Sequence, residues 1–184
     1  SLVGYGYWLD YDDPDDSGPF AYAFSTQTYG LRFTGKTQVA DNLKALYTAE
    51  YAFQSDYQDN PEDYTASYYH FIAGLVVPET GSLFSDLTGQ IAYEVLGADN
   101  GVSFKTPLGT NRAFNGWADL FLTTPPDGLR DLYAKIGCTV AGAKVALVYH
   151  DFQADEGSAD YGTEFDATVS RKFGGHYTVQ AVYA

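Results

Sequence analysis

The sequence lacks the features that mark several common protein classes. It has no methionine and a single cysteine, Cys138, so a framework of intrachain disulfides is excluded. No run of about 18 apolar residues occurs, which excludes a transmembrane helix. Basic residues are scarce: ten Lys and Arg stand against 24 Asp and Glu, and the formal net charge is −14. Because nucleic-acid phosphates attract Lys and Arg, we expect no nucleic-acid partner.

Aromatic residues and glycine are abundant instead, with 17 Tyr, 12 Phe and 19 Gly. Between Thr26 and Gln54 the side chains alternate in character. Odd positions in 29–33 and 43–53 are apolar, whereas most even positions from 26 to 36 and from 44 to 54 are polar. A period of two predicts extended strands with one apolar and one polar face. These strands are long, about 10 residues or more against a usual 5–6, which suits a wall between lipid and water.

The same pattern recurs along the chain and predicts nine strands. Their expected ranges are 1–9, 26–34, 43–54, 68–77, 85–96, 129–140, 144–152, 164–173 and 176–184, with a turn at 35–42 between the second and third. Long and short connections alternate, as they do in outer-membrane barrels. We therefore expect an all-β fold, an antiparallel transmembrane β-barrel, with 1–184 as one domain. Nine strands and the absence of methionine lead us to expect a piece of a larger barrel.

Charge is concentrated in four long connections, 10–21, 55–66, 99–128 and 154–162. They hold fifteen of the 24 acidic residues but only Lys105 and Arg112 of the bases. The remaining segments are nearly neutral, with nine acids and eight bases. The acidity of the chain therefore belongs to its loops.

Several segments resemble the C-terminal half of the alginate-export family of outer-membrane porins. They are YWLDYDD at 7–13, STQTYGLRFTG at 25–35, AEYAFQSDY at 49–57, YEVLGAD at 93–99, TPLGTNRAFNGWADLFL at 106–122 and YHDFQAD at 149–155. The FNGWAD part is the most specific. The resemblance implies a monomeric barrel of up to eighteen strands in the outer membrane of a Gram-negative bacterium. It also implies passive passage of a polysaccharide or a small hydrophilic solute, without a cofactor.

The two faces of the strands have different expected partners, lipid for the apolar face and solute for the polar face. We expect Tyr29, Leu31, Tyr47, Tyr51, Ile91, Tyr93, Val169 and Val179 to face lipid. On the polar face we expect the bases Arg32, Lys36, Lys44, Lys135 and Lys172 and the acids Glu50, Glu94, Asp131, Glu164 and Asp166 to line a lumen, where charge selects solutes. The alternative is plain solvation with salt bridges, for example between Lys44 and Glu50 across a strand pair. Because both signs occur, a carbohydrate and an anionic solute both remain open.

The connection 99–128 is too long for an ordinary turn and too apolar for disorder. We expect a short helix over 117–122 and an inward fold that narrows the pore. Lys105, Arg112, Phe114 and Trp117 are its candidate constriction residues. Stacking of Trp117, Phe114 and Phe121 on a sugar ring is one possibility, and simple anchoring of the loop is the other.

Metal and catalytic sites are weakly indicated. An acidic cluster, Asp10, Asp12, Asp13, Asp15 and Asp16, offers carboxylates to Ca²⁺ but lacks the ligand order of an EF-hand, so a solvated loop is the favoured interpretation. His70, His150 and His176 are scattered, and His150 and Asp151 point to opposite faces of a strand. We therefore expect neither a metal site nor an enzyme.

Two other functions remain open. Unpaired strand edges would make the chain a structural subunit that associates with itself or a partner. Alternatively, the strands form a soluble β-sandwich that binds carbohydrate through surface aromatics. The channel hypothesis predicts contact with outer-membrane lipid and lipopolysaccharide.

Overall fold

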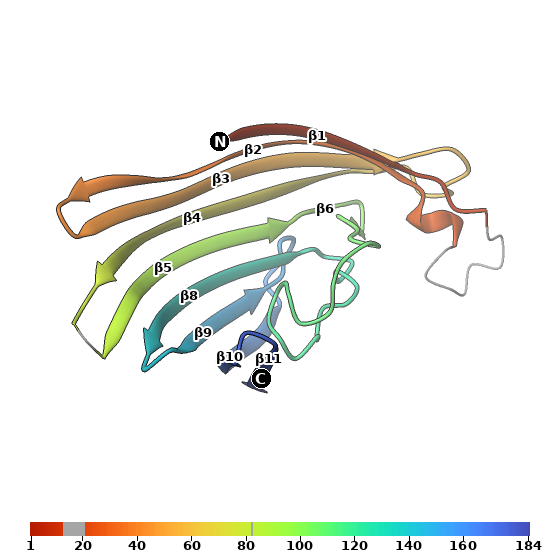
Figure 1. Ribbon diagram of the computed structural model, residues 1–184. Helices are drawn as coiled ribbons and strands as arrows, with labels where there is room; N and C mark the ends of the chain where they lie inside the picture. The colour runs from red at the N-terminus through yellow and green to blue at the C-terminus, as the bar shows by residue number, and fades with distance from the viewer. Residues whose placement is uncertain (13–20, 82) are drawn as a thin grey trace.

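Figure 1 shows the computed structural model, which describes residues 1–12, 21–81 and 83–184. One antiparallel nine-stranded sheet dominates it, and the strands are neighbours in chain order. They are β1 Leu2–Leu9, β2 Thr26–Ala40, β3 Leu43–Asp56, β4 Thr65–Glu79, β5 Phe84–Leu96, β8 Leu129–Val140, β9 Ala143–Gln153, β10 Asp160–Phe173 and β11 Tyr177–Tyr183. A 3-10 helix, Tyr22–Phe24, precedes β2, and the two-residue strands β6 Ala98–Asp99 and β7 Val102–Ser103 pair with each other. The all-β class and the nine long strands are confirmed.

The sheet curves strongly but does not close on itself, so a barrel remains a prediction (Figure 1). Its edges are β1 and β11. Each strand runs antiparallel to its neighbours, and there are nine of them, so the two edge strands run in the same direction. All long connections therefore lie at one end of the strands, the loop end, and all short ones at the other, the turn end.

The predicted turn at 35–42 is wrong, because β2 continues to Ala40, which pairs with Leu43 at the start of β3. Only residues 41–42 connect the two strands. Gly35 has a packing role there instead of a turn role. A Cβ at this position would lie 2.5 Å from the hydroxyl of Tyr47, which crosses over it from the adjacent strand. Glycine in a strand often marks such a close approach.

The two faces of the sheet differ in the way that the alternating pattern predicts. The convex face carries exposed apolar side chains, with Leu31 at 52%, Ile91 at 56% and Ile136 at 58% of their full exposure. Aromatic rings pair across neighbouring strands of this face, for example Tyr29 with Phe53 and Tyr51 with Tyr69. The concave face is polar, and Asp131 and Asp166 on it are fully buried. The sheet thus exposes its apolar face and buries its polar one.

A small apolar core lies on the concave side near the loop end. It consists of Ala52, Tyr64, Ala66, Leu96, Phe104, Leu129 and Phe152, with Phe121 and Tyr161 packed against it. Phe104 and Phe121 come from the long segment 97–128, so this core joins that segment to the sheet.

Candidate functional site on the concave face

Strand register brings the charged side chains of the concave face into rows. In one row Arg32, Glu50, His70, Glu94 and Asp131 are consecutive partners from β2 to β8. Residues opposite each other in an antiparallel sheet share a face, so these side chains project together. Sequence alternation placed each residue on a face, and only the register made them neighbours.

Glu50 of β3 is a buried carboxylate with two partners, Tyr5 of β1 and Arg32 of β2. Its Oε1 accepts a hydrogen bond from the Tyr5 hydroxyl at 2.7 Å, and its Oε2 lies 3.5 Å from Nη1 of Arg32. Lys44 is on the same strand as Glu50, six residues away, so the predicted pairing of these two across strands is wrong. The half-exposed Arg32 takes its place.

Glu94 is the centre of a second polar group. It accepts hydrogen bonds from the Tyr68 hydroxyl at 2.6 Å and from the Asn115 side chain at 3.1 Å. His70 lies 4.0 Å from the same carboxylate and shares a 3.0 Å hydrogen bond with Tyr133. Because Asn115 belongs to the long segment, this group ties that segment to β5.

His150 joins two buried aspartates on neighbouring strands. Its Nδ1 lies 2.9 Å from both oxygens of Asp131, and its Nε2 lies 3.5 Å from Asp166. Since a carboxylate can only accept, Nδ1 carries the proton. The ring also stacks on Phe152 at 5.2 Å. The scattered positions of the histidines in the sequence did not indicate these aspartate partners of His150, while Asp151 is on the opposite face as predicted.

Glu164 of β10 holds the long segment against the sheet. Its Oε1 accepts hydrogen bonds from the backbone N–H groups of Trp117 at 2.6 Å and Ala118 at 2.9 Å. Gly116 lies directly on this carboxylate with φ of +87°, and a Cβ there would be 2.5 Å from Oε1. Only glycine fits both the contact and the conformation. Phe121 adds an apolar contact, with its ring 4.7 Å from Phe152.

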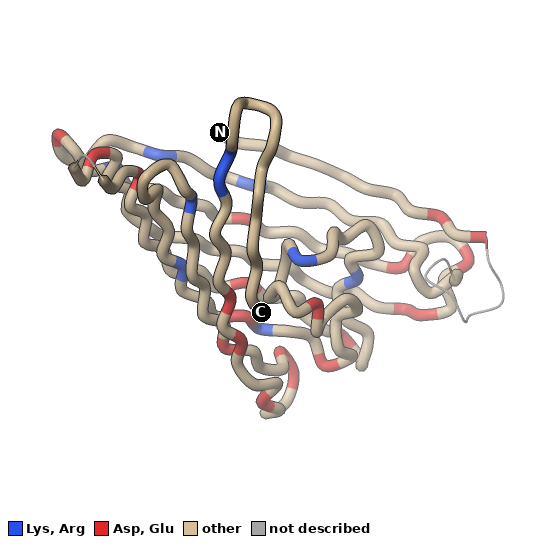
Figure 2. Tube along the Cα trace, turned by 60° about the horizontal axis from the view of Figure 1, so that its bottom comes forward, with Lys and Arg blue, Asp and Glu red and all other residues tan. Residues whose placement is uncertain are grey.

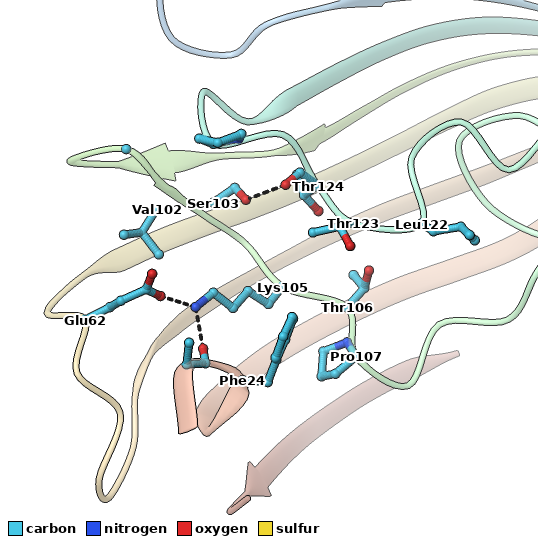
Figure 3. A pocket seen from close by; sticks show the side chains of 13 residues that line it. Phe24, Glu62, Val102, Ser103, Lys105, Thr106, Pro107, Leu122, Thr123 and Thr124 are labelled. Atoms are coloured by element: carbon cyan, nitrogen blue, oxygen red, sulfur yellow. Dashed lines mark hydrogen bonds and ion pairs between the residues drawn. The ribbon is translucent and has the colours of Figure 1, made fainter. Parts of the chain in front are cut away.

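The segment 97–128 is anchored a second time through Lys105 and Gln54. Gln54 accepts a hydrogen bond from the Lys105 backbone N–H at 2.7 Å and donates to the Lys105 carbonyl at 2.9 Å. The Lys105 ammonium group bonds Glu62 and the Ala23 carbonyl (Figure 3). It also lies over the Tyr64 ring at 5.1 Å. Burial and the negative charges of Glu62 and Asp56 raise the pKa of Tyr64. Lys105 thus acts as an anchor in the structure.

Figure 3 shows a pocket of about 230 Å³ beside this anchor. Phe24, Val102, Pro107 and Leu122 give it an apolar lining, and Glu62, Lys105, Thr106 and Thr123 add polar groups. It lies at the loop end, among the connections. The two charged residues of this lining, Lys105 and Glu62, already bond each other.

The lysines of the concave strands lie toward the turn end. Lys36 and Lys135 line a pocket of about 550 Å³ together with Thr34, Thr48, Tyr47 and Gln90. Lys44 lies one register row farther toward the turns than Lys36, and Lys172 is near the last turn. Among the residues that the structure describes, Lys36, Lys44, Lys135 and Lys172 form no ion pair with a carboxylate.

The acidic and the basic side chains of this face differ in burial. Glu50, Glu94, Asp131, Glu164 and Asp166 are each at most 8% exposed. Lys36 and Lys172 are exposed, and Lys44 and Lys135 are partly exposed. Among these residues of the concave face the accessible charge is therefore basic, although the chain as a whole is strongly acidic. Figure 2 shows how many of the acidic positions belong to the connections instead.

The remaining predicted site residues have varied placements. The expected helix over 117–122 is wrong, because Asn115, Gly116 and Asp119 have positive φ and the segment forms turns and bends. Phe114 and Arg112 are exposed, whereas Trp117 is partly buried. Of the weak Ca²⁺ candidates, Asp12 is exposed, and Asp13, Asp15 and Asp16 lie outside the described residues.

Metal-ligand groups and membrane-spanning helices are not found in the part of the chain that the structure describes. Across residues 1–12, 21–81 and 83–184, no three His, Cys, Asp or Glu side chains are grouped as metal ligands would be. In the same described ranges, no helix is long and apolar enough to cross a membrane.

Comparison of the chain with protein-family models, with curated proteins and with solved structures finds no match. The resemblance to the alginate-export family therefore remains a prediction. The proposals below depend on the residues and their geometry.

Proposed function

We propose that this chain forms part of the wall of an outer-membrane channel that passes hydrophilic, anionic solutes. One observation carries the proposal: the sheet exposes its apolar convex face and presents lysines on its polar concave face. Large exposed apolar surfaces are uncommon on soluble monomers and mark contact with lipid or protein. In outer-membrane channels the lipid-facing side chains are apolar and the lumen is polar.

The anionic preference follows from which charges a solute can reach. The concave carboxylates are buried and, apart from oxygens of Glu164 and Asp166, are engaged by tyrosine, histidine, arginine or backbone groups. The lysines near the turn end have no carboxylate partner in the part of the chain that the structure describes. A ring of Lys or Arg is the usual basis of anion selection in a pore. Acidic polysaccharides and organic acids are thus the solute classes that we propose.

The two alternative functions fit the geometry less well. A carbohydrate-binding sandwich needs a second sheet against the apolar face, and the described residues form one large sheet and a two-residue pair. For self-association, copies in the same membrane orientation would meet through β1 and β11. Because these edges run in the same direction, the junction would be parallel, unlike the antiparallel strands of bacterial outer-membrane barrels.

Ion selectivity tests the proposal directly. The protein is reconstituted in planar bilayers, and the reversal potential is measured across a salt gradient. We expect anion selectivity, and we expect Lys36→Glu combined with Lys135→Glu to shift the reversal potential toward cation selectivity. The matched control, Lys36→Arg with Lys135→Arg, keeps the charge and should keep the selectivity. The absence of any conductance from folded protein, or an unchanged selectivity after charge reversal, would contradict the proposal.

We also propose that the segment 97–128 narrows the lumen. Its contacts with Gln54, Glu94 and Glu164 all involve concave-face residues, so it lies on the side that we assign to the pore. Deletion of 108–124 should raise the single-channel conductance. An unchanged conductance from a folded barrel would mean that the segment packs outside the conducting path.

A further inference from the structure

The attachment of the long segment to β10 contains buried carboxylate oxygens without hydrogen-bond donors. Glu164 uses Oε1 for the two backbone N–H groups of the segment, but its Oε2 has no partner, and neither oxygen of Asp166 has one. Glu164 is 7% exposed and Asp166 is fully buried. Buried polar atoms in folded proteins nearly always have a partner, so these three oxygens require an explanation.

The two carboxyl groups are also neighbours. Glu164 and Asp166 are separated by one residue on β10, so their side chains project side by side from its concave face. Two ionised carboxylates in such contact repel strongly when water is excluded. A single proton shared between them removes the repulsion and also provides the missing donor.

The other groups around the pair do not offset all of its negative charge. His150 from β9 lies 3.5 Å from Asp166 through Nε2 and 2.9 Å from Asp131 of β8 through Nδ1, so this ring brings at most one positive charge to three buried carboxyl groups. From the long segment, the N–H groups of Trp117 and Ala118 both bond Glu164 Oε1. The Asn115 side chain bonds Glu94 of β5. No three His, Cys, Asp or Glu side chains are grouped as metal ligands would be among the described residues.

We propose that a proton shared by Glu164 and Asp166 is the latch that keeps the turn at 116–118 of the long segment docked on the sheet, and that its loss releases this turn as the pH rises. Without the proton, Glu164 and Asp166 move apart. Glu164 then withdraws its Oε1 from the turn at Gly116, which packs directly on this carboxylate. Asn115 with Glu94, Lys105 with Gln54 and Phe121 with Phe152 still hold the rest of the segment, so the release is local to the turn at 116–118. The device is a pH-dependent restriction of the concave face.

Trp117 provides a measurement that does not depend on conduction. The chain has two tryptophans, so a Trp8→Phe background leaves Trp117 as the single fluorophore. In detergent-solubilised protein, we expect a red shift of its emission and stronger acrylamide quenching as the pH is raised. Since this assay needs no channel activity, failure of the latch and failure of the proposed channel are distinguishable.

Two isosteric variants test the shared proton from its two sides. Asp166→Asn places a permanent N–H donor beside Glu164, and Glu164→Gln places one beside Asp166 while its oxygen still accepts from Trp117. We expect both variants to remove the pH dependence and to keep Trp117 in its low-pH, docked state. The matched control, Asp151→Asn on the opposite face of the adjacent strand, should titrate like the parent.

Three outcomes would overturn the proposal. One is a parent protein whose Trp117 signal does not change with pH. Another is a set of folded Asp166→Asn and Glu164→Gln variants that titrate like the parent. The third is release of Trp117 by a metal chelator at constant low pH, which would identify a bound cation in place of the proton.

Discussion

The convex and concave faces of the sheet carry opposite side chains and have opposite exposure. Leu31, Ile91 and Ile136 are exposed on the convex face, while Asp131 and Asp166 are buried on the concave face. In a protein surrounded by water, burial usually runs the other way, with apolar residues inside. The difference supports our proposal that the convex face lies in an apolar environment, and it means that the concave face must satisfy its buried charges internally. This is the physical reason for assigning lipid to one face and solute to the other.

The concave face should be most sensitive where His150 lies against Asp131. His150→Leu leaves a fully buried carboxylate without its 2.9 Å donor, and we expect a loss of about 3 kcal/mol in the free energy of unfolding. Urea titration in detergent micelles, followed by circular dichroism, measures it. Asp131→Leu combined with His150→Leu removes the orphaned charge and should recover much of the loss. Equal damage from the single and double variants would show that the pair does not matter as a pair.

A charged side chain on the convex face should destabilise the protein if that face contacts lipid. Leu31→Arg places a guanidinium group on that face, and we expect a loss of about 2–4 kcal/mol when the protein is folded in bilayers. Gln38→Arg, on the exposed concave part of the same strand, is the control and should be close to neutral. Unfolding titrations in lipid vesicles compare the two. Similar stability of both variants would remove the distinction between the faces.

The docked segment should depend on the absence of a side chain at Gly116. Gly116→Ala introduces a Cβ that meets the Glu164 carboxylate in a backbone conformation with φ of +87°, and we expect a cost of about 1–3 kcal/mol. The damage should be local, with the strands intact and Trp117 more accessible to acrylamide. Gly109→Ala, in the same segment but without positive φ, is the comparison. Loss of the whole sheet signal would show that the segment is essential for folding.

The smallest effect is expected at the partly exposed edge of the concave network. Arg32 is 46% exposed where it meets Glu50 at 3.5 Å, and such pairs contribute about 0.2–1 kcal/mol. Arg32→Gln should therefore lower the free energy of unfolding by no more than this amount. The difference from the parent protein should be smaller in high salt. Lys36→Gln, which removes a charge without an ion-pair partner, is the control. A loss of several kcal/mol would mean that Arg32 neutralises more than Glu50.

The sequence by itself determined the strands and the face to which each side chain belongs. A period of two is a local property of extended backbone, so the convex positions of Leu31, Tyr51 and Ile91 follow from alternation alone. The same local logic placed Glu50, Glu94 and Lys135 on the concave face. It failed at Gly35, because the sequence does not distinguish a glycine that makes room for an aromatic ring on the next strand from a glycine in a turn. It failed again at 117–122, where positive φ values interrupt an apolar segment with a helix-like spacing.

Only the tertiary structure decided which side chains meet. The contacts of His150 with Asp131 and Asp166, and of Arg32 with Glu50, join residues 16 to 19 positions apart in the chain and depend on the register between their strands. Docking of Trp117 on Glu164 joins residues 47 positions apart. Register is set by the summed hydrogen bonding and packing of whole strands, and no local pattern records it. The separation of the concave charges into buried acids and accessible lysines therefore appeared only when the strands were placed side by side.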